Sequence, residues 1–263
     1  MTDLAGMRAL VTGASSGIGA AIARELAARR VDLVLTARRK DALAEVAAAC
    51  TGVKVDVVAA DLGKPSAGSV VWEAATAGGA IDIVVNNAGF GYLTPFASAS
   101  WERDAEMIQL NMTSLVELSR RFVDAMTRDK ARRGYLLNIA SIGAYQAVPN
   151  MALYGATKAF VRDFTEALHD ELAGSELSAT VVCPGGTRTA FHDVAGAGNY
   201  GWLAKQSWKT AEQVASFAVR AMVRRKRIAI PGVMNKLSCW GVRLIPRRLA
   251  SWLARRIMGR PRD

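Results

Sequence analysis

Two residues with titratable side chains, Tyr154 and Lys158, lie four positions apart in the sequence Tyr-Gly-Ala-Thr-Lys. In a helix this spacing places both side chains on one face. A phenol with a pKa near 10 exchanges protons poorly at neutral pH, and an adjacent ammonium favours the phenolate. Lowering that pKa from about 10 to about 7 takes roughly 4 kcal/mol, which requires a partly desolvated site with a cofactor bound. We predict proton transfer by Tyr154, although such a pair alone is more often part of a helix surface.

A glycine-rich segment follows the first predicted strand and opens a helix. Glycines allow a tight turn and a close approach of the backbone, and the helix N-terminus offers N–H groups to a pyrophosphate. The alternative, a plain strand-to-helix turn, is disfavoured by this context. The predicted cofactor contacts in this turn are Gly13, Ser15, Ser16, Gly17, Ile18 and Gly19.

The second predicted strand ends in Arg38 and Arg39, where a chain that binds NAD usually has an acid. An arginine can hold a 2′-phosphate through two hydrogen bonds and stack on the adenine. We therefore predict that NADP(H) is preferred over NAD(H), mainly through Arg38; a solvated basic pair is the alternative. Asp61, after the third strand, is placed to meet the adenine amino group or to serve as a turn residue.

Taken in order, these motifs resemble the short-chain dehydrogenase/reductase family over residues 7 to 191. The motifs that carry the resemblance are the TGxxxGxG turn of Gly13, Gly17 and Gly19, the segment Asn86-Asn87-Ala88-Gly89, the helix residue Asn111, Ser141 thirteen residues before Tyr154, the YxxxK pair, and the turn Pro184-Gly185 with Thr189. Two departures are visible. Ser15-Ser16 carries no basic residue, and Thr187 occupies a position that is often aliphatic in the family.

The resemblance implies four catalytic residues. Ser141 would hydrogen-bond the substrate oxygen, and Tyr154 would supply or remove the proton. Lys158 would hold the nicotinamide ribose and lower the pKa of Tyr154, and Asn111 would position a water that links Lys158 to solvent. The other cofactor contacts that it implies are Leu62, Asn87, Ala88, Gly89, Tyr154, Lys158, Pro184, Gly185, Thr187 and Thr189.

Metal-binding and disulfide patterns are not apparent in the sequence. His169 and His192 lack metal-ligand spacing, and His192 lies near enough to the Pro-Gly turn to touch substrate, although a surface position is the expectation. The cysteines, which we expect to be reduced core thiols, are Cys50, Cys183 and Cys239. We expect no metal site.

Short β-branched runs that alternate with Ala-rich helical stretches must position these residues. The predicted strands are Arg8–Thr12, Val31–Thr36, Val53–Val58, Ile81–Val85, Gly134–Ile139, Ala179–Cys183 and Arg227–Ile230. The predicted helices are Gly17–Arg30, Asp41–Cys50, Trp101–Met126, Met151–Ala173 and Thr210–Arg224, the last with a capping box of Thr210 and Gln213. This rhythm predicts an α/β fold: a single-domain, Rossmann-like, doubly wound parallel sheet of about seven strands, with helices on both faces.

The C-terminal segment carries the whole net charge of +11. Twelve of the 34 Lys and Arg residues but one of the 23 acids follow residue 223. We divide the chain into a catalytic domain at 1–232 and a basic extension at 233–263, read as two amphipathic helices hinged at Pro246. Docking on the protein itself or on a second subunit, peripheral membrane contact, and binding of an acidic partner remain open. The neutral body argues against nucleic acid as the partner.

The segment 187–208 resembles a substrate lid, and its aromatic residues suit a bulky apolar substrate or the packing of the lid itself. These residues are Phe191, Tyr200, Trp202 and Trp208. The resemblance suggests a homodimer or homotetramer packed through 101–126 and 151–173. No secretion signal or membrane-spanning run is recognisable, so we expect a cytoplasmic protein, either free or peripherally bound to a membrane.

Together these features predict an oxidoreductase that moves a hydride between NADP(H) and a carbonyl or secondary alcohol carbon. The alternative is a dinucleotide-binding sensor or scaffold that acts through its basic tail. The combination of Asn111, Ser141, Tyr154 and Lys158 favours the enzyme, because a sensor needs no proton shuttle.

Overall fold

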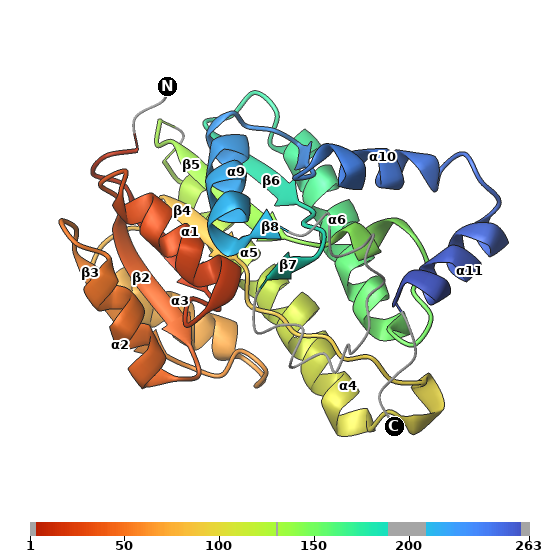
Figure 1. Cartoon of the computed structure of the whole chain (residues 1–263). Helices are drawn as coiled ribbons and strands as arrows, with labels where there is room; N and C mark the ends of the chain where they lie inside the picture. The colour runs from red at the N-terminus through yellow and green to blue at the C-terminus, as the bar shows by residue number, and fades with distance from the viewer. Residues whose placement is uncertain (1–3, 130, 189–208, 259–263) are drawn as a thin grey trace.

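The computed structural model of the chain describes residues 4–129, 131–188 and 209–258. Within these residues, seven parallel strands form one sheet in the order β3-β2-β1-β4-β5-β6-β9 (Figure 1). The strands are β1 (Arg8–Thr12), β2 (Asp32–Ala37), β3 (Val55–Ala59), β4 (Ile83–Asn86), β5 (Gly134–Ile139), β6 (Leu177–Val182) and β9 (Ile228–Ala229). Each lies within two residues of its predicted bounds, which confirms the predicted fold class.

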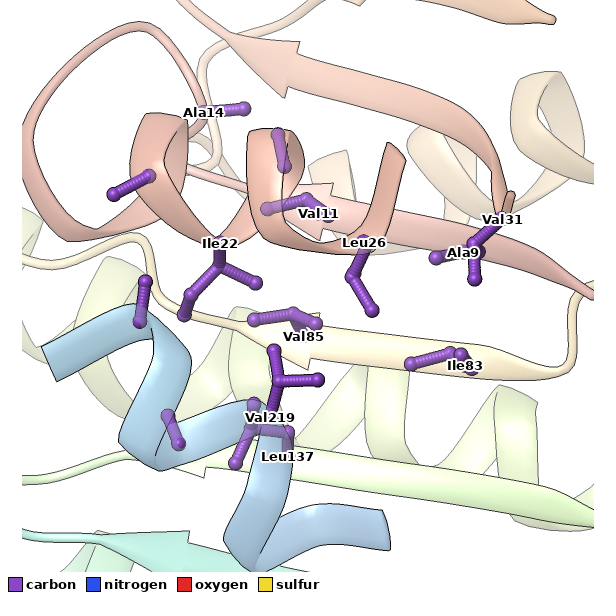
Figure 2. Close-up of a cluster of buried hydrophobic side chains, with 14 of the residues drawn as sticks. Ala9, Val11, Ala14, Ile22, Leu26, Val31, Ile83, Val85, Leu137 and Val219 are labelled. Carbon is purple, nitrogen blue, oxygen red and sulfur yellow. The ribbon is translucent and has the colours of Figure 1, made fainter. Parts of the chain in front are cut away.

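Helices cover both faces of the sheet. One face carries α1 (Gly17–Ala27), α2 (Lys40–Ala49) and α9 (Ala211–Val223), and the other carries α3 (Ala67–Ala77), α5 (Ser114–Thr127) and α6 (Ala152–Glu171). Figure 2 shows how the first layer packs: Ile22 and Leu26 of α1 and Val219 of α9 converge on Val85 and Leu137 of the sheet. The central strands are mostly apolar and buried because helices cover both faces of the sheet.

Several elements differ from the sequence prediction. The predicted helix 101–126 is divided into α4 (Trp101–Ile108), a π-helical segment η2 (Gln109–Thr113) and α5. Helix α3 was not predicted, nor was a two-stranded sheet of β7 (Thr187–Arg188) and β8 (Lys209–Thr210). The predicted capping box of Thr210 and Gln213 is present at the start of α9.

Two 3-10 turns and two C-terminal helices complete the described chain. Two 3-10 turns, η1 (Phe96–Ser98) and η3 (Ile142–Tyr145), follow β4 and β5, and the chain ends in α10 (Val233–Gly241) and α11 (Arg247–Met258). The two terminal helices confirm the predicted hinge at Pro246. No helix in the described residues is long and apolar enough to span a membrane. Cys50, Cys183 and Cys239 are buried and have free thiols.

The strand order places a crevice between β1 and β4. Successive strands run outward from β1 in one direction and from β4 in the other, so the loops at their carboxyl ends separate there. In open parallel sheets ligands bind at this point. The segments that follow β1, β4 and β5 therefore meet at the predicted site.

The opposite, amino edge of the sheet carries partly buried ion pairs. The Arg8 guanidinium lies 2.7 Å from the Asp56 carboxylate and donates to the Gly79 carbonyl at 2.8 Å. Asp82 accepts from the Arg8 backbone N–H at 2.8 Å and lies 2.6 Å from Arg132. These contacts join β1, β3 and the segment before β4.

Candidate active site

The turn between β1 and α1 has the backbone conformation that its glycines allow. Gly13 and Gly17 have φ values of +63° and +56°, in the left-handed region that glycine adopts without strain. A Cβ on Gly19 would collide with the carbonyl oxygen of Gly13. Ser16 precedes α1 without a side-chain cap hydrogen bond, so the first amides of α1 are open to an anionic ligand. This open helix end fits the pyrophosphate of a dinucleotide.

Thr12 and Asn87 lock this turn to the end of β4. The Asn87 side chain donates to the carbonyls of Thr12 and Gly13 at 3.0 and 3.2 Å. The Thr12 hydroxyl accepts from the backbone N–H groups of Asn87 and Ala88, both at 3.0 Å. Sequence reasoning did not assign Thr12 a role, although the residue is almost fully buried and holds two predicted cofactor contacts in place.

Arg38 directly follows β2 and forms an ion pair with an acid of α4. Its Nη1 lies 3.2 Å from Oε1 of Glu106, and both side chains are exposed. Glu106 also lies beside the loop after β3, because a Cβ on Gly63 would be 2.9 Å from its Cγ. Arg38, which we predict to bind the 2′-phosphate, therefore lies next to a carboxylate that was not predicted from the sequence.

Asp61 and Leu62 form the loop after β3. The Asp61 carboxylate accepts from the Gly63 N–H at 3.0 Å, which is the turn role considered as its alternative. The carbonyl of Leu62 accepts from the Ser114 hydroxyl at 2.6 Å, and this bond ties the loop to the start of α5.

Tyr154 and Lys158 lie on α6, as the spacing predicted. The Lys158 ammonium donates to the carbonyl of Ile139 at 2.9 Å and lies 5.9 Å from the centroid of the Tyr154 ring. Because Lys158 is buried, desolvation lowers its pKa from 10.5 to about 8. Ser141 follows β5 two residues after Ile139 and caps η3, accepting from the Gly143 N–H at 3.1 Å.

Asn111 lies inside the π-helical segment and is buried. Its amide donates to the Phe90 carbonyl at 2.9 Å and to the Thr157 hydroxyl at 3.1 Å, and its carbonyl accepts from the Phe90 N–H at 3.1 Å. π-Helical turns often occur at functional sites. Here the segment holds Asn111 against both the loop after β4 and helix α6.

Two glycines after β4 allow these side chains to meet. A Cβ on Gly89 would lie 2.9 Å from the Asn111 side-chain oxygen and 3.3 Å from the Lys158 nitrogen. A Cβ on Gly91 would overlap the ring of Tyr154. The loop after β4 thus passes directly over three of the four predicted catalytic residues. Sequence reasoning assigned Gly89 but missed Gly91, whose signal was a second glycine two positions later.

The Pro-Gly turn after β6 packs against α10. A Cβ on Gly185 would lie 2.5 Å from the amide nitrogen of Asn235, which is buried and donates to the Pro231 carbonyl at 2.8 Å. Thr187 is buried, and its hydroxyl donates to the Gly185 carbonyl at 3.1 Å. Thr189, His192 and the four lid aromatics lie outside the described residues.

The surroundings of Tyr154 are apolar. Its ring packs against a buried cluster of Leu93, Val148 and Met151. The Tyr154 ring therefore contacts hydrocarbon and also lies near the Lys158 ammonium. Among the described residues, no group of three or more His, Cys, Asp or Glu side chains could hold a metal ion. A bound dinucleotide together with this constellation can support hydride transfer coupled to proton transfer.

Comparisons with known proteins agree with this arrangement. Residues 7–199 match the short chain dehydrogenase family. The ketoacyl reductase HetN of Nostoc is 33% identical over 188 residues, which cover 70% of this chain and 65% of that protein.

Two solved structures are similar along most of their length. A short-chain dehydrogenase from Sphingobium yanoikuyae in complex with NADPH has a TM-score of 0.80 at 31% identity, covering 90% of this chain and 94% of the other. The bulky-bulky ketone specific alcohol dehydrogenase from Comamonas testosteroni has a TM-score of 0.76 at 27% identity, covering 92% and 94%.

Proposed function

This chain belongs to the short-chain dehydrogenase/reductase family and is an oxidoreductase, and we propose that it uses NADP(H) to interconvert a bulky apolar ketone and its secondary alcohol. The observation that carries the proposal is the position of Lys158, whose buried ammonium lies beneath the Tyr154 ring and next to the strand that precedes Ser141. When bound, NADP(H) supplies the hydride. The side chains of the protein bind and orient the cofactor and the substrate, and they exchange the proton with the substrate oxygen.

Each catalytic side chain has a role in this proposal. The Ser141 hydroxyl donates to the substrate oxygen and stabilises the charge that develops there. The Tyr154 hydroxyl gives its proton to that oxygen during reduction and removes it during oxidation. The Lys158 ammonium lowers the pKa of the phenol and binds the nicotinamide ribose. Asn111 places a water between Lys158 and solvent.

The residues that would hold the cofactor come from the five loops after β1, β2, β3, β4 and β6. The α1 N-terminus, with the turn from Gly13 to Gly19, receives the pyrophosphate. Arg38 would bind the 2′-phosphate and Asp61 the adenine. Asn87, Ala88, Gly89, Pro184, Gly185, Thr187 and Thr189 would line the remaining path of the cofactor.

A bulky apolar substrate is supported by the hydrocarbon around the reactive phenol. Leu93, Val148 and Met151 surround Tyr154, and the proposed lid at 187–208 is rich in aromatic residues. The similar Comamonas enzyme is described as specific for bulky-bulky ketones.

We further propose a catalytic domain at 1–232, a C-terminal extension at 233–263, a cytoplasmic location, and a dimer or tetramer packed through 101–126 and 151–173.

The reaction is tested by replacing Tyr154 with Phe. The variant keeps the ring and loses the hydroxyl, so turnover of a responsive ketone with NADPH should fall by about 10²- to 10⁴-fold. Affinity for NADPH, measured by the quenching of tryptophan fluorescence, should change little. Equal, negligible turnover by wild type and variant across a broad carbonyl panel would instead favour a dinucleotide sensor.

The cofactor preference is tested at Arg38 and its partner. Arg38→Gln should weaken NADPH binding by about tenfold or more and leave NADH binding nearly unchanged, because charge-assisted bonds to the phosphate are lost. Glu106→Gln frees the guanidinium and removes a nearby negative charge, so NADPH should bind up to about fivefold more tightly. Dissociation constants for both nucleotides, with Arg39→Gln as the matched control, measure these effects. Equal changes for NADPH and NADH would exclude Arg38 as the phosphate ligand.

A further inference from the structure

Helix α10 turns its large apolar side chains toward solvent. Its inward side consists of Asn235 and Cys239, which are buried. The outward side chains, between 61% and 84% exposed, are Val233, Met234, Leu237, Trp240 and, just past the helix, Leu244. At 100° per residue, Val233, Leu237 and Trp240 form one narrow stripe on α10, and Met234 lies beside it.

Helix α11 repeats this arrangement. Ala250 and Ala254 are buried, whereas Leu249, Trp252 and Leu253 are between 39% and 48% exposed. Figure 1 shows α10 and α11 together on the outside of the molecule, at the end farthest from β3. Both helices therefore place small or polar residues inward and large apolar residues outward, the reverse of a helix that docks on its own protein. We call the exposed apolar residues of 233–254 the C-terminal apolar face.

Basic side chains border this face and lack acidic neighbours. Lys236, Arg243, Arg247 and Arg248 are exposed, and in the described part of the chain no carboxylate lies within ion-pair distance of them. In contrast, Arg225 pairs with Glu176 at 2.9 Å, and Arg227 pairs with Glu166 at 3.1 Å. Two of the basic residues before α10 are thus paired with carboxylates, whereas none of these four around the apolar face is, within the described residues.

The start of α11 adds a second electrostatic observation. Arg247 and Arg248 occupy its first turn, which contains no acid. Cations are unfavourable at a helix N-terminus because the macrodipole is positive there. An external anionic surface relieves this repulsion.

We infer that the C-terminal apolar face binds the surface of an anionic lipid bilayer. A second copy of the chain fits less well, because a symmetric contact would bring two uncompensated basic tails together. An acidic protein or a nucleic acid would neutralise the arginine charges but would leave the Trp, Leu and Met side chains exposed to water. A bilayer interface satisfies both groups, since tryptophan and leucine enter the acyl boundary while arginine and lysine meet anionic headgroups.

The inference is tested by cosedimentation of the full-length protein with vesicles. Wild type should sediment with phosphatidylcholine vesicles that contain phosphatidylserine and bind far less to phosphatidylcholine alone. Trp240→Ser/Leu244→Ser removes two exposed apolar anchors and should weaken partitioning at least tenfold. Arg247→Gln/Arg248→Gln should weaken it about fivefold for each charge removed, with a shallower dependence on salt.

Matched controls distinguish binding by this surface from nonspecific binding of the protein to vesicles. Trp101→Ser replaces a tryptophan that is 71% exposed on α4, and Lys64→Gln/Arg128→Gln removes two exposed charges elsewhere. Neither control should change partitioning, and all variants should keep the wild-type melting temperature because the replaced side chains are exposed. Three results would overturn the inference: no sedimentation of wild type with the anionic vesicles, equal losses in the controls, or a wild-type oligomer that Trp240→Ser/Leu244→Ser dissociates in analytical ultracentrifugation.

Discussion

The ammonium group of Lys158 is buried between the end of β5 and the ring of Tyr154. Burial disfavours its charged form and lowers its pKa to about 8, while the bond to the Ile139 carbonyl fixes its direction. The proposed reaction requires this charge where folding opposes it. Residues kept for function at the expense of stability are common in active sites.

Replacing Lys158 with Met tests this conflict. Between pH 8 and 10.5 the unfolded chain binds more protons at this residue than the folded chain, so its contribution makes wild-type stability rise with pH across that window. The rise is on the order of 3 kcal/mol and should be absent in the variant. Urea unfolding at several pH values measures it, with Lys64→Met as the exposed control. A difference between variant and wild type that does not change with pH would contradict a charged, desolvated Lys158.

At the scale of elements, a buried amide network joins strands and helices beneath the site. The Asn86 side chain donates to the Asn138 carbonyl at 2.9 Å and to the Ser119 hydroxyl at 3.1 Å. The Asn138 amide donates to the Thr165 hydroxyl at 2.8 Å. These bonds connect β4, β5, α5 and α6, so they set the position of the helix that carries Tyr154 relative to the loop after β4.

Asn138→Ala should lower the free energy of unfolding by about 2–4 kcal/mol, because the buried side chains of Asn86 on β4 and Thr165 on α6 each lose a hydrogen bond. The double variant Asn86→Ala/Asn138→Ala should lose at least about 0.5 kcal/mol less than the sum of the single variants, since the two residues share one network. Thr180→Val is the matched control: its buried hydroxyl has no partner among the described residues, so the change should be neutral or stabilising. Chemical denaturation of the four variants decides, and strictly additive losses would rule out a shared network.

The elements that the sequence predicted are those with strong local patterns. The β-branched runs revealed all seven strands of the main sheet, and the four residues that the family motifs predict to be catalytic lie on or beside the elements expected. Helix α3 was not predicted because its alanine, glycine and threonine residues give only a weak apolar stripe. The π-helical segment could not be predicted because helical apolar spacing continues on both sides of it. The Arg38–Glu106 ion pair could not be predicted because its residues are 68 positions apart in the sequence, and local patterns do not reveal such contacts.

At the scale of the whole molecule, the C-terminal helices are tied to the cofactor end of the sheet. The amide of Asn235 fills the space where Gly185 has no side chain. A residue in the proposed extension thus supports a turn in the proposed catalytic domain. A displacement of α10 would therefore be transmitted to the Pro-Gly turn of the proposed cofactor site.

Gly185→Ala should push α10 away from this turn, because the new Cβ would lie 2.5 Å from the Asn235 nitrogen and 2.7 Å from its oxygen. We expect a lower melting temperature and weaker NADPH binding. Adding Asn235→Ala removes the obstruction and should restore much of both losses. Gly241→Ala, where a Cβ meets nothing within 4 Å, is the neutral control. If the second substitution restores neither property, the defect arises in the turn itself and not from α10.

The ion pairs of Arg8 with Asp56 and of Arg132 with Asp82 lie at the edge of the sheet farthest from the glycine-rich turn. They are therefore separated from the proposed site by the full length of the strands. We expect substitutions at this amino edge to change the thermal stability of the protein while leaving cofactor recognition at the carboxyl edge unchanged.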